Sequence, residues 1–222
     1  MYLNKYKFFL LLVFVFLLFS FNKVNAYIND FPLLNKVIYL DAGHGGVDPG
    51  ALYGNLYEKD ITLEITKKLA LELEKKGAIV LMTREGDYDL ANVGVNMRKR
   101  SDLANRANLI NESNCDLYIS IHLNAYSSSK WRGLQIFYDN VNKKNKLVAE
   151  TINSVLKEKL ENVRDIKNEN GYYMYSKIKV PGILIEAGFI TNFDDRNLLK
   201  QDSYQRLLAS SIADAIDYYF NK

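Results

Sequence analysis

Two histidines, the only two in the chain, each follow a short apolar run. His44 lies in a glycine-rich loop after the run that starts at Val37, and His122 ends the run that starts at Leu117. Because open α/β folds bind ligands where their strands end, we expect both imidazoles at one edge of a sheet. Imidazole is a common zinc ligand, so this pairing favours a shared metal over two unrelated loop or core histidines.

Two glutamates lie where they could complete such a site. Glu58 begins a predicted helix just after the His44 loop, and a third protein ligand leaves the fourth zinc position open for water. Equally, Glu58 fits an ordinary acid at a helix N-terminus, stabilised by the helix dipole. Glu186 ends the apolar run that starts at Ile183, where a buried carboxylate is costly unless it is paired or beside a cation. Its alternative role is structural, holding the turn that follows.

The hydrophobic pattern alternates strands with helices along the chain. It predicts strands at 36–40, 78–83, 117–122, 133–138 and 183–186, a short candidate strand at 172–174, and helices at 58–76, 96–111, 146–160 and 204–220. The run at 78–83 shows no alternation, which predicts a central strand covered on both faces. The order predicts one α/β domain with a twisted, mixed but mostly parallel sheet of about six strands and helices on both faces.

Composition excludes several other classes of protein. The chain has 222 residues, 48% hydrophobic and 25% charged, which suits one globular domain. A net charge of +3 without an arginine-rich tract argues against nucleic acid as a partner, although weak contact with an anionic surface stays compatible. The lone Cys115 fits a small buried residue better than a nucleophile. The helix at 96–111 carries basic residues that we expect on a solvated face, namely Arg98, Lys99, Arg100 and Arg106.

The N-terminal segment has the pattern of a secretory signal. Lys5 and Lys7 precede the uncharged apolar run 8–21, and Val24-Asn25-Ala26 fits a signal-peptidase site. The run is short for a membrane span, and an uncleaved anchor is the alternative. We therefore expect a signal at 1–26, a short linker at 27–35 and an exported catalytic domain at 36–222.

Four blocks of sequence carry a family resemblance. LDAGHGGVDPGA, YEKDITLEI, RANLINESNCDLYISIHLNA and ILIEAGFITN, in that order, resemble the zinc-dependent N-acetylmuramoyl-L-alanine amidases of bacterial cell walls, and the match spans residues 37–220. The resemblance implies one zinc ion held by His44, Glu58 and His122, with Glu186 as the catalytic glutamate. It implies peptidoglycan as the substrate.

Within this family, the chain is most similar to the germination-specific amidases of spore formers. The similarity rests on the absence of a wall-binding repeat and on the stretch KWRGLQIFY after His122. It implies removal of stem peptides from cortex peptidoglycan outside the cytoplasm, as a step towards muramic-δ-lactam, with a separate deacetylase acting next. Trp131 in this stretch is a candidate substrate contact, or it simply caps the sheet edge.

The implied mechanism divides the work between the metal and Glu186. Zinc would acidify its bound water and polarise the carbonyl, and Glu186 would pass the water proton to the L-alanine nitrogen. Arg106 and Asn124 are further candidates, either to support the metal ligands from behind or to contact a substrate carboxylate. A zinc peptidase, a glycan deacetylase and a catalytically silent wall-binding module are the alternatives, although Glu186 argues against the last. The polar loop at 84–95 and the missing wall-binding repeat suggest an accessory activator associated with the wall or membrane.

Overall fold

The structure is a computed structural model that describes residues 7, 9–17 and 31–222. Residues 9–17, inside the predicted signal, are helical. The rest of that signal apart from residue 7, its predicted cleavage site and residues 27–30 of the predicted linker lie outside the described residues. Among the described residues, no helix is long and apolar enough to cross a membrane.

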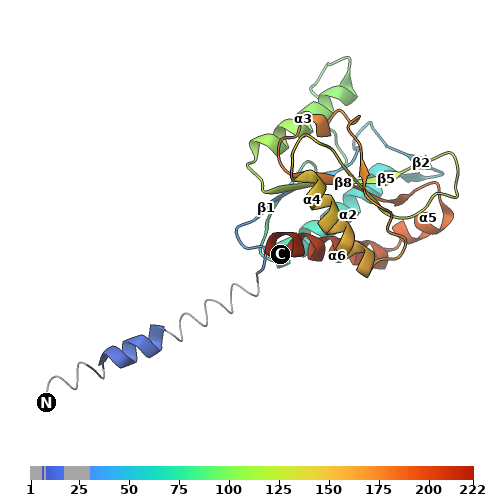
Figure 1. Cartoon of the computed structure of the whole chain (residues 1–222). Helices are drawn as coiled ribbons and strands as arrows, with labels where there is room; N and C mark the ends of the chain where they lie inside the picture. The colour runs from blue at the N-terminus through green and yellow to red at the C-terminus, as the bar shows by residue number, and fades with distance from the viewer. Residues whose placement is uncertain (1–6, 8, 18–30) are drawn as a thin grey trace.

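One six-stranded sheet organises the domain (Figure 1). The strands β4, β1, β5 and β8 are parallel, β6 pairs antiparallel with β8, and β7 pairs parallel with β6. This confirms the predicted mostly parallel, mixed sheet. In sheet order the strands are β4 (Ile79–Met82), β1 (Val37–Ala42), β5 (Leu117–Asn124), β8 (Gly182–Phe189), β6 (Gln135–Tyr138) and β7 (Lys167–Asn168).

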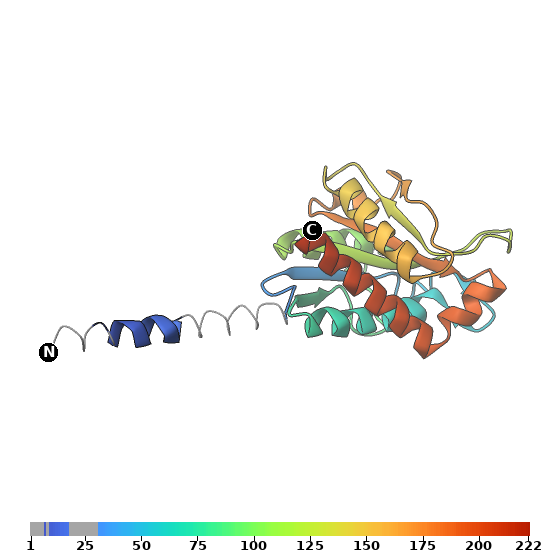
Figure 2. The same cartoon turned by 60° about the horizontal axis from the view of Figure 1, so that its bottom comes forward.

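Helices cover both faces of this sheet, as predicted. On one face α6 (Asp202–Asn221) packs against both α2 (Glu58–Lys75) and α4 (Asn145–Lys159) (Figure 2). The opposite face is covered by α3 (Arg98–Glu112) and the single-turn helix η1 (Tyr175–Lys177), which share a smaller apolar cluster with the strands. Cys115 is buried in that smaller cluster, as expected.

The sequence of α2 shows why it lies where it does. Ile61, Ile65, Leu69 and Leu73 recur at helical spacing, and all four are buried in the main core with the strands. Burying an aliphatic side chain of this size contributes roughly 1.5–3 kcal/mol. This stripe fixes the rotation of α2 and so aims its first residue, Glu58, at the end of the sheet.

Some elements were predicted wrongly, and other elements were not predicted at all. The run at 78–83 forms an edge strand, β4, in which Ile79 is 56% exposed. A run without polar–apolar alternation indicates that both faces of the strand are apolar, but it does not indicate how many strands lie beside it. Residues 172–174 form coil and turn, and the sixth strand is instead β7. Three short elements were not predicted, because they are too short to show a hydrophobic period. They are β2 (Leu52–Tyr53) and β3 (Leu56–Tyr57), which form a hairpin, and the helix α5 (Phe193–Leu199).

Candidate active site

The four predicted site residues meet where β1, β5 and β8 end. His44 lies in the loop after β1, and Glu58 is the first residue of α2. His122 of β5 and Glu186 of β8 are direct partners in the register of those two parallel strands. All four line one cavity of about 270 Å³. The predicted meeting of both imidazoles at one sheet edge is thus what the structure shows.

Three of these residues converge on one point. His44 Nε2 lies 3.1 Å from Glu58 Oε1, and His122 Nδ1 lies 3.0 Å from the same oxygen. The candidate ligand atoms of the three side chains all lie within 4.8 Å of one another. Burial raises the pKa of Glu58, but its hydrogen bonds with His122 and His44 outweigh burial and hold that pKa well below its usual range. Two imidazole nitrogens and one ionised carboxylate could hold a divalent metal ion with a position to spare.

His44 is held from both sides of its ring. Its backbone has a φ of +62°, in the left-handed region, and its Nδ1 lies 3.0 Å from Asp48 Oδ2, which leaves Nε2 for Glu58. Burial lowers the pKa of His44, but the hydrogen bonds with Asp48 and Glu58 prevail and raise it to about 9. A carboxylate on the far nitrogen is the common arrangement for a metal-binding histidine, because it fixes the tautomer and the ring orientation.

Arg106 holds the backbone of the His44 loop from beneath. It is 1% exposed and donates to Asp41 Oδ1 at 2.9 Å, to Asp102 Oδ2 at 2.9 Å, and to the carbonyls of Ala42 at 2.7 Å and His44 at 2.6 Å. The prediction that Arg106 lies on a solvated face is therefore wrong. Four of its five N–H donors are used in this way and Arg106 does not line the catalytic cavity, so among its two candidate roles the structure favours support of the loop.

Arg84 and two glycines complete this support. Arg84 is also fully buried and donates to the carbonyl of Gly43 at 2.8 Å. A Cβ at Gly43 would lie 2.4 Å from the His122 ring, so only glycine lets the loop approach the imidazole this closely. Gly50 has a φ of +69°, and a Cβ there would lie 2.6 Å from Glu58 Oε2. The glycine-rich sequence is thus required by close packing on two of the three candidate ligands.

Glu186 differs from the other three site residues. It is 8% exposed, and its Oε2 has no hydrogen-bond partner among the described residues. Burial raises the pKa of Glu186 to about 7, with the charge of Glu58 adding to the rise and those of His122 and His44 opposing it. The turn after β8 is held instead by Asp195, whose carboxylate accepts from the Phe189 amide at 2.9 Å. The structure gives Glu186 no role in that turn, and a carboxyl with a near-neutral pKa suits a general base.

Two of the candidate substrate contacts lie elsewhere. Within the described chain, neither Asn124 nor Trp131 lines the catalytic cavity. The carbonyl of Asn124 accepts from Ile190 at 2.9 Å, and the half-exposed Trp131 packs under the guanidinium of Arg164, 4.8 Å from its ring centroid. Residues that the sequence did not single out line the cavity instead, chiefly Tyr172 and Tyr173. No periodic pattern marks those tyrosines, because they lie in an irregular segment.

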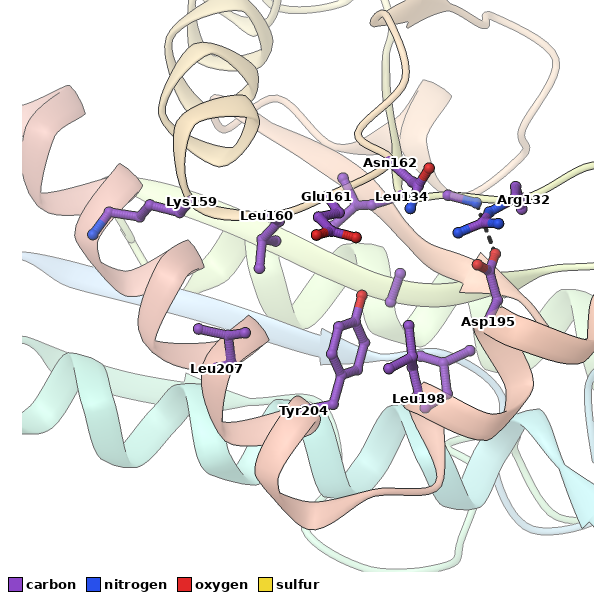
Figure 3. A pocket seen from close by; sticks show the side chains of 13 residues that line it. Arg132, Leu134, Lys159, Leu160, Glu161, Asn162, Asp195, Leu198, Tyr204 and Leu207 are labelled. Carbon is purple, nitrogen blue, oxygen red and sulfur yellow. Dashed lines mark hydrogen bonds between the residues drawn. The ribbon is translucent and has the colours of Figure 1, made fainter.

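A larger cavity of about 350 Å³ lies against α4, α5 and α6, on the other face of the sheet from α3 (Figure 3). Tyr204 reaches into its centre between leucine side chains. Its most deeply placed carboxylate, Asp195, already accepts from the amides of Gly133 at 2.7 Å and Phe189 at 2.9 Å. None of the four predicted site residues lines this cavity, so it is separate from the candidate active site.

Comparison with known proteins gives a consistent result. The family model for N-acetylmuramoyl-L-alanine amidase matches residues 38–218. The germination-specific N-acetylmuramoyl-L-alanine amidase of Bacillus subtilis is 46% identical over 222 residues, covering 96% of this chain and 93% of that protein. The probable cell wall amidase LytH of Staphylococcus aureus is 34% identical over 194 residues, covering 86% of this chain but only 60% of LytH.

Solved structures agree with these relatives. The CwlD amidase of Clostridioides difficile, in complex with the GerS lipoprotein, matches with a TM-score of 0.80 and 37% identity, covering 84% of this chain and 99% of that one. The N-acetylmuramoyl-L-alanine amidase AmiC2 of Nostoc punctiforme matches with a TM-score of 0.72 and 27% identity, covering 84% and 98%. The six-stranded α/β fold described above is shared with these proteins.

Proposed function

Because this chain belongs to the N-acetylmuramoyl-L-alanine amidase family, we propose that it uses a zinc ion to hydrolyse the amide between N-acetylmuramic acid and L-alanine in spore-cortex peptidoglycan. The observation that carries the site assignment is the convergence of two imidazoles and a carboxylate beside an unpartnered buried glutamate. Amide hydrolysis needs both a metal-held water and a proton acceptor, and this arrangement offers a place for each.

The metal would be held by His44 Nε2, His122 Nδ1 and Glu58 Oε1. Two nitrogens and one oxygen suit zinc, and three protein ligands are typical of catalytic zinc sites. When bound there, zinc supplies a water acidified to a pKa of about 7 and a Lewis acid for the substrate carbonyl. The other oxygen of Glu58 accepts from the Ala51 amide at 2.8 Å, which keeps the carboxylate aimed at the two histidines.

Glu186 would act as the general base and then as the acid. Its free oxygen can accept a proton from the attacking water and return it to the L-alanine nitrogen as the amide bond breaks. A hydrogen bond from another side chain would oppose that transfer by stabilising the charged form, and the structure shows none to Oε2 within its described part.

The spore-cortex substrate is supported by the similarity to the germination-specific amidase over nearly the full length of both chains. Removal of the stem peptide leaves a free lactyl carboxyl on muramic acid, and a deacetylase that frees the neighbouring amine would permit lactam closure. Cortex peptidoglycan incubated with the protein should therefore release peptides with L-alanine at the N-terminus, measured by mass spectrometry. Release of acetate, of reducing ends or of peptides cut inside the stem would contradict the proposal.

An accessory protein is the second part of the proposal. The Clostridioides difficile amidase that shares this fold was solved in complex with a lipoprotein, which supports a partner of that kind here. Its substrate would place the enzyme outside the cytoplasm, in agreement with the signal predicted at residues 1–26. Full turnover of cortex peptidoglycan by the purified chain alone would remove the need for an activator, and N-terminal sequencing of exported protein would test cleavage after Ala26.

A further inference from the structure

The catalytic cavity adjoins a second hollow at the start of α3. This second hollow has a volume of about 550 Å³ and shares Lys99, Leu103 and Tyr173 with the catalytic cavity. Its remaining lining comes from the residues just before and within the first turn of α3, which are Asn96, Met97, Arg98 and Arg100. A substrate whose reacting amide lies at Glu186 can therefore extend along the start of α3.

The charged side chains that line this second hollow are all cationic. Among the residues that the structure describes, its lining contains three cationic side chains and no acidic one. Arg98 is already paired with Asp89, at 3.0 Å. Arg100 forms no ion pair with a described carboxylate, and its guanidinium lies over the Tyr173 ring, 4.8 Å from the centroid. Lys177, which does not line the hollow, approaches the same ring at 5.7 Å, so positive charge exceeds negative charge around Tyr173.

Lys99 lies between this charge and the catalytic residues. Its side chain is 65% exposed, and its Nζ lies 3.2 Å from Asp48 Oδ2. That oxygen also lies 3.0 Å from His44 Nδ1, so Lys99 shares its partner with a histidine. A long, mostly exposed lysine can turn from this contact towards an incoming anion at little cost.

We propose that Lys99 binds a carboxylate of the stem peptide and that the hollow beside α3 is the peptide side of the active site. This inference rests on the proposed amidase function, in which the leaving group is that peptide. The two halves of the substrate differ in charge: the stem peptide carries free carboxylates beyond L-alanine, whereas the N-acetylated glycan carries none. A hollow next to the general base that is lined by three cations and no acid thus favours the anionic half of the substrate and sets the direction in which the substrate lies.

The test uses binding, so that it does not depend on turnover. Full-length protein carrying Glu186→Gln and loaded with zinc is titrated by calorimetry with N-acetylmuramoyl-L-alanyl-D-glutamate and with the same compound having both carboxyls amidated. Adding Lys99→Gln should weaken binding of the acid about five- to tenfold, the scale of one partly exposed charge-assisted hydrogen bond, and change binding of the amide less than twofold. Lys99→Arg should retain most of the affinity for the acid.

Lys146→Gln is the matched control, because this lysine is 63% exposed, pairs with an acid on its own helix and lies on α4, across the sheet from α3. Equal weakening for acid and amide, or weakening together with lost zinc, would instead make Lys99 a support for Asp48 and would overturn the proposal. So would unchanged affinity for the acid. If unmodified enzyme releases no peptide from muropeptides while carboxylate-dependent binding persists, the proposed amidase function fails and the peptide side stands.

Discussion

The loop that carries His44 and the strand that carries Glu186 differ in how many hydrogen-bond partners they give to their site residue. On the loop side, His44 contacts two carboxylates, and the carbonyls around it are bonded by the buried guanidiniums of Arg84 and Arg106. On the strand side, Glu186 is buried, yet its Oε2 has no described partner. A residue that holds a metal must not move, whereas a residue that carries a proton must be free to take it.

Two buried acids near the site, Asp41 and Glu186, show the same contrast in their pKa values. Burial raises the pKa of Asp41, but the charges of Arg106 and His122 and the hydroxyls of Ser120 and Thr83 outweigh burial. This pKa is therefore lowered, and the carboxylate stays charged. For Glu186, burial prevails and raises the pKa to about 7. The surroundings of Asp41 thus suit a structural role, whereas those of Glu186 suit the proton transfer that we propose for it.

Removing the metal should have the largest effect. Chelation should abolish peptide release and added zinc should restore it, and His122→Ala should remove most zinc binding because two protein ligands hold the ion weakly. Zinc content by atomic emission and peptide release by chromatography measure both effects. Full activity in metal-free protein would contradict the proposed role of the three ligands.

Glu186→Gln should separate the two sides of the site. An amide cannot accept and return the water proton, so kcat should fall by about 10² to 10⁴ while the variant stays folded and retains its zinc. Glu58→Gln is the matching change on the ligand side, where zinc affinity should fall before any purely kinetic defect is seen. Loss of zinc in Glu186→Gln would make Glu186 a ligand, and near-normal turnover with zinc bound would exclude it as the base.

Asp48→Asn should have a smaller effect, and that effect should be confined to metal binding by His44. The amide can still contact His44 Nδ1, but it no longer provides a negative charge to orient and polarise the ring. Loss of such a partner typically lowers metal affinity about 10- to 100-fold, so zinc should dissociate more readily while kcat at saturating zinc stays within about threefold. A competition titration against a chromophoric chelator measures this. Unchanged affinity would show that Asp48 does not support the ligand.

Much of this contrast could be predicted from the sequence, and the missing part has a physical cause. The strand runs ending near His44, His122 and Glu186 placed three of the site residues, because parallel strands end at one edge. The buried position of Arg106 was missed because a charge on a helix is usually solvated. Asp102 precedes Arg106 by four residues on the same helix, so helical spacing alone brings that pair together, at 2.9 Å. Only the fold brings Asp41 of β1 against the same guanidinium, also at 2.9 Å, and buries it.

The supporting contacts escaped prediction for a related reason. Asp48 follows His44 by four residues in a loop, and no hydrophobic period describes such a loop. Lys99 was placed correctly on an exposed surface, but its closeness to Asp48 depends on how α3 packs over the sheet. Helix and strand periods thus predict which residues reach the sheet edge, whereas contacts between loops and helix faces depend on tertiary packing.

Tyr175→Phe should have the smallest effect, because it removes only the outermost hydrogen bond of the network that leads through Ser120 and Asp41 to Arg106. The Tyr175 hydroxyl donates to Ser120 Oγ at 3.0 Å, and Ser120 in turn donates to Asp41. Phenylalanine keeps the ring and leaves the bond from Ser120 to Asp41 intact, so no buried donor loses its partner. The expected loss of unfolding free energy is about 1 kcal/mol, the typical net value of one such hydrogen bond.

Urea unfolding and kcat/KM measured together decide this last case. The exposed Tyr218→Phe, on α6, is the control and should leave both unchanged. Tyr175 also lines the catalytic cavity, so its hydroxyl could serve the substrate instead of the network. A fall in kcat/KM of tenfold or more, with stability and zinc content unchanged, would place the hydroxyl on the substrate. A loss of stability with kcat/KM within about threefold would keep it in the network, because Asp41 and the other partners of Arg106 still hold the His44 loop.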